Sequence, residues 1–395
     1  MKDLTYLKTF IIDSKNPKEI DDAVSLEIQN DEITNIWIHI SYPVKLFEFN
    51  SKIDLKARKN SSSIYLIDKY ISMLPLEIIE ESNLKQNKVS ETISACIELR
   101  ENGSIKRYQI LETLIKPNYE LTYDDANDLL ELEPSEEYEL IILNKLLKKS
   151  LSYRKENGAL IFDTPYSKII KENNNIIFEK IEITEAHKLI SEAMILMGSV
   201  ISDFLFKNKI SAPFRSQKIN CDVNQILLKN NESLVKYSIL KQYIGKSFIS
   251  IKPNKHETLG LKSYVQSTSP LRRYLDLIVQ RQLYFYLNNQ ETINEDIINK
   301  IIEENNIKQK EIYSIIKDNK LTYLRIFFKS KANFLFKIIF IRWINYKKNI
   351  ALVYFPDYYL EILINLYISI DTYTNKVYKV KYNIDSNSNL LEFTN

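Results

Sequence analysis

Four acidic side chains stand within ten residues near the start of the chain: Asp13, Glu19, Asp21 and Asp22 follow directly after the apolar run Leu7–Ile12. Carboxylate oxygens are the ligands that magnesium prefers in proteins. Two such ions can together hold the attacking and leaving oxygens of a phosphodiester. These residue types therefore indicate a metal site for phosphate chemistry, although a chain with 51 Asp and Glu residues also forms solvated acidic turns.

The surrounding sequence predicts that the acidic cluster lies between two strands. Asp13 ends an apolar stretch, Pro17 interrupts the chain, and Asp21 and Asp22 precede the segment Ala23–Ile28. Turn residues between two such segments favour a strand, a loop and a second strand. We therefore expect the carboxylates to meet at the ends of strands and not to spread over a helix face.

A second candidate lies far along the chain, where Ser269 and Pro270 precede an apolar-periodic run. This order is typical of a helix start, with serine as the cap and proline in the first turn. Arg272 and Arg273 would then lie where free backbone N–H groups and the helix dipole favour an anion, and arginine can hold a phosphate through two hydrogen bonds. The alternative is that both guanidinium groups pair with nearby acids such as Asp276.

These two features belong to a longer series of motifs, which resembles the catalytic RNB domain of the ribonuclease II family. The strand, Asp13 and the acid-x-Asp-Asp-Ala motif open the series, and the matches keep the family's order over about residues 5 to 290. The other matching segments are Ile38–Ile40, Ile53–Arg58, Ser63–Leu66, Met73–Pro75, Leu121–Ala126, Arg154–Phe162, Ser191–Met194, Ala212–Arg215 and His256–Tyr274.

The resemblance implies roles for the acidic loop and for one arginine. Asp13, Asp21 and Asp22 fall on the family's metal-binding and catalytic aspartates, and Asp21 falls on the position most critical for the chemistry. Glu19 occupies the second acidic position, where the family has Asp, and is expected to bind metal with them. Arg272 matches the arginine that contacts the scissile phosphate. The implied cofactor is Mg²⁺, with Mn²⁺ as an alternative.

The resemblance also implies contacts with RNA. Tyr65 and Phe162 match two aromatic side chains that stack on bases near the 3′ end, and Glu192 matches an acid that engages the terminal nucleotide. Arg215 and Arg273 lie in matched motifs and are expected to bind RNA. The implied reaction is hydrolytic, processive 3′→5′ digestion of single-stranded RNA to 5′-mononucleotides. Stacking suits this task because it holds any base, although in a chain with 26 Tyr and 17 Phe most rings only pack.

Departures from the family pattern leave other functions open. Besides Glu19, Ser41-Tyr42 replaces the usual Ala-Asp pair and Ser191 replaces a common acid. The first motif at residue 13 leaves no room for the family's N-terminal cold-shock OB-fold domains, so a protein partner could supply their RNA contacts. The competing hypothesis is a catalytically weak or silent RNA-binding or regulatory protein of the same fold. A DNA nuclease would use the same metal chemistry.

The predicted elements describe an α+β fold, with a mixed sheet and surrounding helices over residues 1–332 and a small OB-like barrel over residues 333–395. Strands are expected at Thr9–Ile12, Ala23–Ile28, Ile33–Ile40, Glu91–Leu99, Ile105–Ile115, Ala159–Asp163 and Asn175–Ile183. Helices are expected from a capping box at Thr122 and over Leu140–Glu156, Ile183–Asn208, Pro270–Asn288 and Asn294–Phe328.

The C-terminal part combines basic and aromatic residues in a way that suits single-stranded nucleic acid. Eight Lys or Arg and no acid occur from Asn319 to Pro356, interleaved with ten aromatic residues. Alternating segments between Phe336 and Phe393 predict the short strands of an RNA-binding barrel of OB type. The alternative is a barrel whose aromatic side chains form its core and whose lysines only solvate it.

Composition agrees with a soluble, cytoplasmic enzyme, which we expect to be a monomer. The net charge is only +3, so attraction to RNA must come from local patches. No signal peptide opens the sequence, and the apolar segment Phe334–Ile344 is too short and too charged to span a membrane. Two cysteines and three histidines exclude a disulfide framework and a Cys/His zinc site.

Overall fold

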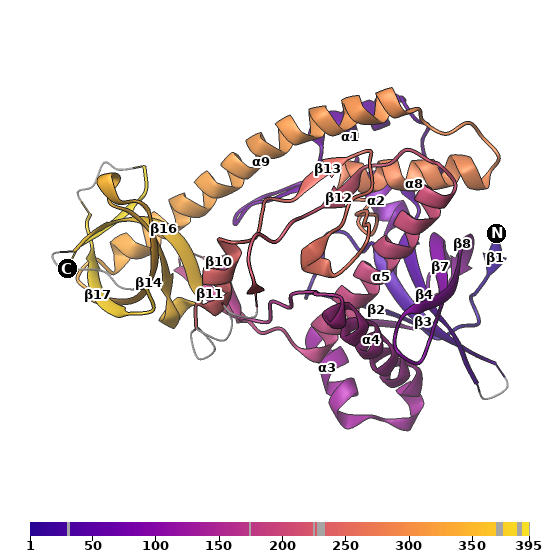
Figure 1. The fold of residues 1–395 in the computed structure, drawn as a ribbon, viewed down its shortest axis with the longest axis horizontal. Helices are drawn as coiled ribbons and strands as arrows, with labels where there is room; N and C mark the ends of the chain where they lie inside the picture. The colour runs from indigo at the N-terminus through magenta and orange to yellow at the C-terminus, as the bar shows by residue number, and fades with distance from the viewer. Residues whose placement is uncertain are drawn as a thin grey trace.

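A computed structural model describes residues 1–29, 32–173, 175–223, 226, 234–368, 374–384 and 389–394. A large body built on a mixed sheet and a small β-barrel lie at the two ends of the long helix α9, Glu295–Ser330 (Figure 1). This arrangement confirms the predicted α+β fold with a C-terminal barrel.

Seven strands form the central sheet, in the order β1-β8-β7-β4-β3-β2-β9. Their bounds are β1 Lys2–Asp3, β2 Thr9–Asp13, β3 Asp22–Gln29, β4 Glu32–Ser41, β7 Ser90–Leu99, β8 Ile105–Ile115 and β9 Tyr119–Thr122. β1 pairs with β8 and β2 with β9 in parallel, and the other neighbours are antiparallel. The five strands predicted in this region are confirmed, with ends shifted by at most one residue.

Three helices pack against strands β2, β3 and β4: α3 (Tyr123–Leu132), α4 (Tyr138–Glu156) and α5 (Glu185–Lys207). The capping box predicted for α3 is present, since Thr122 Oγ1 accepts from Asp125 N and Asp125 Oδ2 accepts from Thr122 N. Helix α8 (Tyr274–Leu287) adds Leu277, Ile278 and Val279 to the same core.

Helix α5 is long and apolar enough to cross a membrane by length and composition, which makes it a stronger candidate than the segment Phe334–Ile344. However, 61% of its most apolar window is buried inside the protein. Ala193, Met197 and Val200 on this helix belong to the main core. Packing in the core accounts for the hydrophobicity of α5, because a helix that is buried on most sides is apolar all round.

Short elements surround the central sheet: α1 (Lys52–Asn60), α2 (Leu76–Ser82), α7 (Lys236–Lys241), and the antiparallel pairs β5 (Ile64–Tyr65) with β6 (Tyr70–Ile71) and β12 (Phe214–Ser216) with β13 (Phe248–Ser250). The strand predicted over Ala159–Asp163 is wrong. Ala159 N donates to Arg154 O at the end of α4, and Leu160 N donates to Thr258 O in a loop, so no neighbouring strand pairs with this segment.

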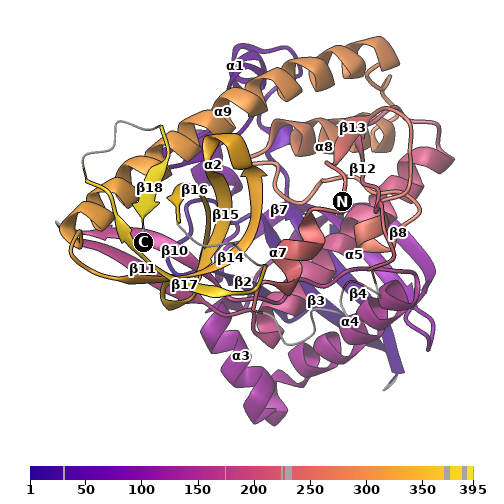
Figure 2. The ribbon, with the colours of Figure 1, turned by 60° about the vertical axis from the view of Figure 1, so that its left-hand side comes forward.

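The hairpin of β10 (Tyr166–Glu172) and β11 (Asn175–Ile181) lies beside the barrel (Figure 2). Its Phe178 ring lies 4.7 Å from the ring of Phe327 on α9 and 5.1 Å from that of Tyr358. The hairpin and the end of α9 therefore share one apolar cluster with the barrel. The strand predicted over Asn175–Ile183 is confirmed.

Five strands close the barrel in the order β14-β15-β16-β18-β17. Their bounds are β14 Phe336–Asn345, β15 Ile350–Phe355, β16 Leu360–Tyr367, β17 Val377–Tyr382 and β18 Leu391–Thr394. Most of the aromatic side chains considered for stacking are core residues, which agrees with the alternative that they form the core of the barrel. The buried rings are Phe327, Phe328, Phe336, Phe340 and Phe355. Phe334 and Tyr346 remain exposed.

Candidate active site

The acidic loop joins two neighbouring strands. Asp13 is the last residue of β2 and Asp22 the first of β3, and the two strands pair antiparallel, with Phe10 opposite Val24. Asp13 and Asp22 therefore lie at the same end of two adjacent strands, as the sequence predicts. Asp21, immediately before β3, is 3% exposed.

The two carboxylate oxygens of Asp21 differ in their hydrogen bonding. Its Oδ1 accepts from Leu271 N at 3.0 Å and from Ser41 Oγ at 3.3 Å. Its Oδ2 is buried without a hydrogen bond, and Arg272 Nε lies 3.5 Å from it. Buried carboxylate oxygens are nearly always satisfied, so an orphaned one beside other acids is the mark expected of a cation ligand.

The three aspartates repel one another in a poorly solvated place. Burial raises the pKa of Asp21 to about 7, against the opposing charge of Arg272. Burial and the charges of Asp21 and Asp13 raise the pKa of Asp22 to about 8. Burial also raises the pKa of Asp13. A bound divalent cation would offset this repulsion, so these residues fit a metal.

The aspartates do not form a closed coordination shell. Among the described residues, no three His, Cys, Asp or Glu side chains lie close enough together to hold an ion as they stand. The fit consequently rests on the orphaned oxygen of Asp21 and on the mutual repulsion of the neighbouring carboxylates, and water and substrate oxygens would have to complete the shell.

Hydroxyl groups surround the carboxylate of Glu19, for which the sequence predicts a metal role. The side chain is 5% exposed, and three hydroxyl groups donate to it: Ser63 Oγ to Oε1 at 2.8 Å, Tyr70 Oη to Oε1 and Tyr65 Oη to Oε2. Both oxygens therefore accept hydrogen bonds, and the metal role of Glu19 stays a prediction. The extra methylene relative to Asp lets the carboxylate reach the β5–β6 pair, so Glu19 positions Tyr65 and Tyr70 beside the acidic loop.

Helix α8 starts at Tyr274, four residues later than the predicted Pro270. The backbone of Arg273 is extended and forms an isolated antiparallel β-bridge with Ser62. On either side of this bridge, Ser63 N donates to Arg272 O and Tyr274 N donates to Ser61 O. Pairing with this distant segment replaces the first helical turn. The two arginines precede the helix, and the argument that the helix dipole attracts an anion there does not apply.

The two arginines have different surroundings. Arg273 makes hydrogen bonds to Asp276 Oδ2 from Nε at 3.0 Å and from a terminal nitrogen at 2.6 Å, and a third to Ser269 Oγ. The acid-pairing alternative therefore holds for Arg273. The side chain of Arg272 is 43% exposed, and its nearest acid is Asp21 at 3.5 Å, so its guanidinium remains available to a phosphate.

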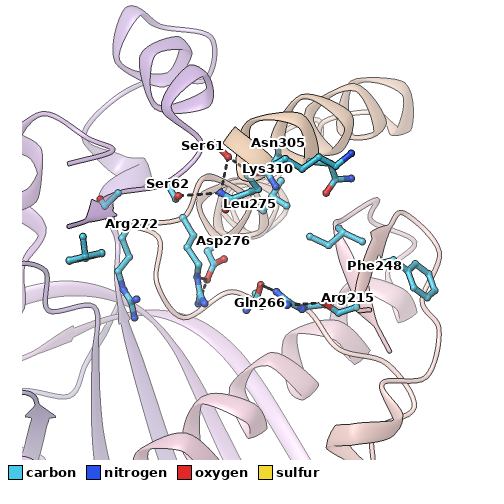
Figure 3. Close-up of a pocket in the computed structure, with 17 residues that line it drawn as sticks. Ser61, Ser62, Arg215, Phe248, Gln266, Arg272, Leu275, Asp276, Asn305 and Lys310 are labelled. Carbon is cyan, nitrogen blue, oxygen red and sulfur yellow. Dashed lines mark hydrogen bonds and ion pairs between the residues drawn. The ribbon is translucent and has the colours of Figure 1, made fainter. Parts of the chain in front are cut away.

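Four of the predicted residues line one pocket of about 740 Å³: Tyr65, Arg215, Arg272 and Arg273. Arg272 stands on one side, Arg215 on the other, and Asn305 and Lys310 of α9 above (Figure 3). Arg215 donates to Gln266 Oε1 at 2.5 Å and to Ser247 Oγ at 2.9 Å. The Tyr65 side chain is 44% exposed and could present its ring to a ligand.

Phe162 and Glu192 do not line this pocket. Phe162 lies in the irregular segment after α4, is 37% exposed, and contacts the ring of Tyr237 at 5.3 Å. Glu192 is 2% exposed and accepts from Arg154 Nε at 3.0 Å and from Ser150 Oγ at 2.8 Å. The predicted RNA contact of Glu192 has no support in this arrangement, because its carboxylate is enclosed in a buried ion pair.

Three residues near the acidic loop were not predicted as site residues from the sequence. Burial and the charges of Asp22 and Asp13 raise the pKa of Tyr123, whose ring stacks on His187 at 3.9 Å. Ser41 orients Asp21, and Tyr70 binds Glu19. Tyr123 could have been found, because it follows the cap residue inside a matched motif; Tyr70 carries no local signal.

Comparison with known proteins identifies the family of this chain. The profile of the RNB domain matches residues 1–289. An uncharacterized ribonuclease of Synechocystis sp. is 31% identical over 91% of this chain and 55% of its own length. The chain spans about half the length of the curated relatives it matches.

Solved structures show the same fold. An active-site mutant of the Dss1 exoribonuclease of Candida glabrata has a TM-score of 0.87 at 21% identity, over all of this chain and 55% of that one. RNase R of Mycoplasma genitalium in complex with ribose-methylated single-stranded RNA has a TM-score of 0.86 at 20% identity, over all of this chain and 71% of that one. Yeast Ssd1, a pseudonuclease, has a TM-score of 0.69 at 17% identity, over 92% and 50% of the two chains. The RNB domain covers residues 1–289, which is more than half of the chain, so the chain belongs to the RNB domain family.

Proposed function

We propose that this chain is a metal-dependent exoribonuclease that hydrolyses single-stranded RNA from the 3′ end and releases 5′-mononucleotides. The observation that carries the proposal is the arrangement of Asp21, which has one buried oxygen free and the exposed guanidinium of Arg272 beside it. The names of the relatives support it, as does the RNA complex of RNase R.

The residues of the site would bind the metal, the phosphate and the base. Asp13, Asp21 and Asp22 would hold Mg²⁺ or Mn²⁺, which when bound would neutralise phosphate charge and lower the pKa of the attacking water. Leu271 N and Ser41 Oγ fix the Asp21 carboxylate, so its free oxygen needs no reorganisation. Arg272 would bind the scissile phosphate through its planar fork. Tyr65, held by Glu19, would stack on a base without reading its identity.

Incubation with labelled RNA tests the proposal. The substrate is a 5′-labelled single-stranded poly(A) of about 30 nucleotides at an ionic strength of about 0.1 M, with magnesium, manganese or a chelator. We expect a metal-dependent descent of product lengths, and a 3′-labelled substrate should release labelled mononucleotide from the outset. A matched DNA oligomer should remain intact, and its digestion would identify a DNA nuclease.

A catalytically silent RNA-binding protein is the second candidate. Two observations favour it: the described acids form no closed metal shell, and Glu19 is bound to hydroxyl groups. The pseudonuclease Ssd1 provides a precedent for the fold. A shift in RNA mobility without cleavage in either metal would support this candidate over the enzyme.

Replacement of Arg272 by alanine should lower the rate of cleavage about a hundredfold, because the loss of one positioned donor to the charge that develops on the phosphate typically costs about that much. Arg272→Lys should recover only part of the loss, since an ammonium cannot bind two phosphate oxygens in the same fork. Single-turnover rates and RNA dissociation constants measure both effects. Arg107→Ala removes an exposed guanidinium on β8 and serves as control; equal losses in the two alanine variants would contradict the role of Arg272.

Replacement of Glu19 by glutamine should raise the KM for RNA about tenfold while the affinity for Mn²⁺ changes less than about twofold. The amide keeps one accepting oxygen in place of two, so the hydroxyl groups of Ser63, Tyr65 and Tyr70 cannot all donate to it. The change also removes the negative charge, and hydrogen bonds to charged groups contribute roughly 1.5–3 kcal/mol. Steady-state kinetics and Mn²⁺ binding followed by electron paramagnetic resonance measure the two quantities. Tyr70→Phe should show a weaker form of the same effect. A large loss of Mn²⁺ affinity in Glu19→Gln would instead make Glu19 a metal ligand.

A further inference from the structure

The pocket beside Arg272 carries more positive charge than its own acids neutralise. Arg215, Arg272, Arg273 and Lys310 line it, and Asp276 is the one acid among the described residues of its wall. Asp276 is 1% exposed and accepts hydrogen bonds from the Arg273 side chain and from Ser269 N. Four cations of the wall therefore face one anion, and Arg272 also lies 3.5 Å from Asp21, so the surplus charge is that of Arg215 and Lys310, which form no ion pair among the described residues.

Arg215 is the clearest sign of an anion site within this pocket. Both of its described side-chain contacts are to neutral groups, Gln266 and Ser247, and it makes no ion pair with any acid in the described part of the chain. These two contacts fix the guanidinium at the pocket wall (Figure 3). A half-buried arginine that is oriented by neutral acceptors keeps its charge for a ligand.

The wall contributed by α9 is polar and held in place. Gln309 Nε2 donates to Ser61 Oγ at 3.0 Å and to Ser62 Oγ at 3.1 Å, and Ser61 Oγ donates to Asn305 Oδ1 at 2.6 Å. Ser61 is 1% exposed and serves only to hold this network. The half-buried Ser62 hydroxyl and Gln309 amide oxygen can bind the hydroxyls of a ribose and the edge of a base. Leu275 and Ile249 add apolar surface between the two walls.

We propose that this pocket binds a nucleoside 5′-monophosphate, with its phosphate at Arg215 and Lys310 and its nucleoside on the wall formed by Ser62 and Gln309. This inference rests on the proposed function, because such a nucleotide is the product of that reaction. Arg272 lies both 3.5 Å from Asp21 and on the pocket wall, so a product released at the acidic loop has a cationic path into the pocket. The volume of about 740 Å³ is within the range of small-ligand sites.

Binding of AMP by isothermal titration calorimetry tests this site without any need for catalysis. The full chain is titrated in the presence of a chelator, and adenosine and inorganic phosphate are titrated separately. AMP should bind more tightly than either part. Lys310→Glu should weaken AMP binding about tenfold, since it reverses an exposed charge at the wall. Lys308→Glu is the matched control, because Lys308 lies on the same helix, pairs with Glu311 and does not line the pocket.

The outcomes separate the pocket from the proposed function. AMP binding that Lys310→Glu weakens supports the pocket even if labelled RNA is not cleaved, in which case only the proposed activity fails. If RNA is cleaved, AMP should inhibit multiple-turnover digestion, and the inhibition constant should rise in Lys310→Glu and not in Lys308→Glu. The inference would be overturned if AMP did not bind, or if both variants and the unmodified chain bound AMP equally. It would also be overturned if inorganic phosphate bound as tightly as AMP, because the pocket would then be an anion site without nucleotide recognition.

Discussion

Replacement of Asp21 by asparagine is expected to reduce RNA hydrolysis by at least about a thousandfold while the dissociation constant for RNA changes less than about twofold. The amide oxygen of asparagine can still accept from Leu271 N, so the local fold is preserved. The amide nitrogen, however, would replace the free Oδ2, which removes the negative charge and places a donor against the guanidinium of Arg272. The loss should therefore fall on catalysis and not on folding or RNA binding.

Single-turnover cleavage of labelled RNA measures the rate, and filter binding measures the RNA affinity. Asp128→Asn is a suitable control, because Asp128 is an exposed acid on α3 and the same change of charge and volume there leaves the site intact. Thermal unfolding of both variants should match that of the unmodified chain. If Asp21→Asn cleaved RNA at the unmodified rate, the assignment of the chemistry to the acidic loop would be wrong.

Elements with local signals could be predicted from the sequence. The strands of the central sheet alternate or run apolar between turn residues, and the five predicted there match the structure within one residue at each end. The start of α3 was predictable because the capping box at Thr122 involves residues only three apart. The acidic loop was predictable for the same reason, since its placement needs only that two short strands flank it.

Features set by contacts between distant segments could not be predicted. The start of α8 depends on pairing between Arg273 and Ser62, which are more than two hundred residues apart in the sequence. The binding of Glu19 by Tyr65 and Tyr70 depends on the β5–β6 pair folding over the acidic loop. Composition likewise could not decide which aromatic residues of the barrel stack on a ligand, because closure of the strands buries most of them.

Removal of the Glu192 carboxylate is expected to destabilise the fold by about 3–5 kcal/mol, the cost of leaving one buried charge without its partner. Arg154 is 4% exposed, and Glu192 accepts two hydrogen bonds from its Nε at 3.0 and 3.2 Å and another from a terminal nitrogen. In Glu192→Ala the guanidinium would keep Leu259 O as an acceptor and lose its counter-ion. Urea and thermal unfolding of the full chain measure the change in stability.

A double-mutant cycle shows whether the pair acts as a unit. Glu192→Leu combined with Arg154→Met should be more stable than the sum of the two single changes predicts, because neither charge is then stranded. Lys106→Ala breaks an exposed pair with Glu98 and should cost no more than about 1 kcal/mol. RNA affinity provides the discriminating measurement, since a structural Glu192 leaves binding by the folded fraction unchanged. A variant at Glu192 that is fully stable but loses RNA affinity would instead place this side chain in contact with the substrate, which requires the ion pair with Arg154 to open when RNA binds.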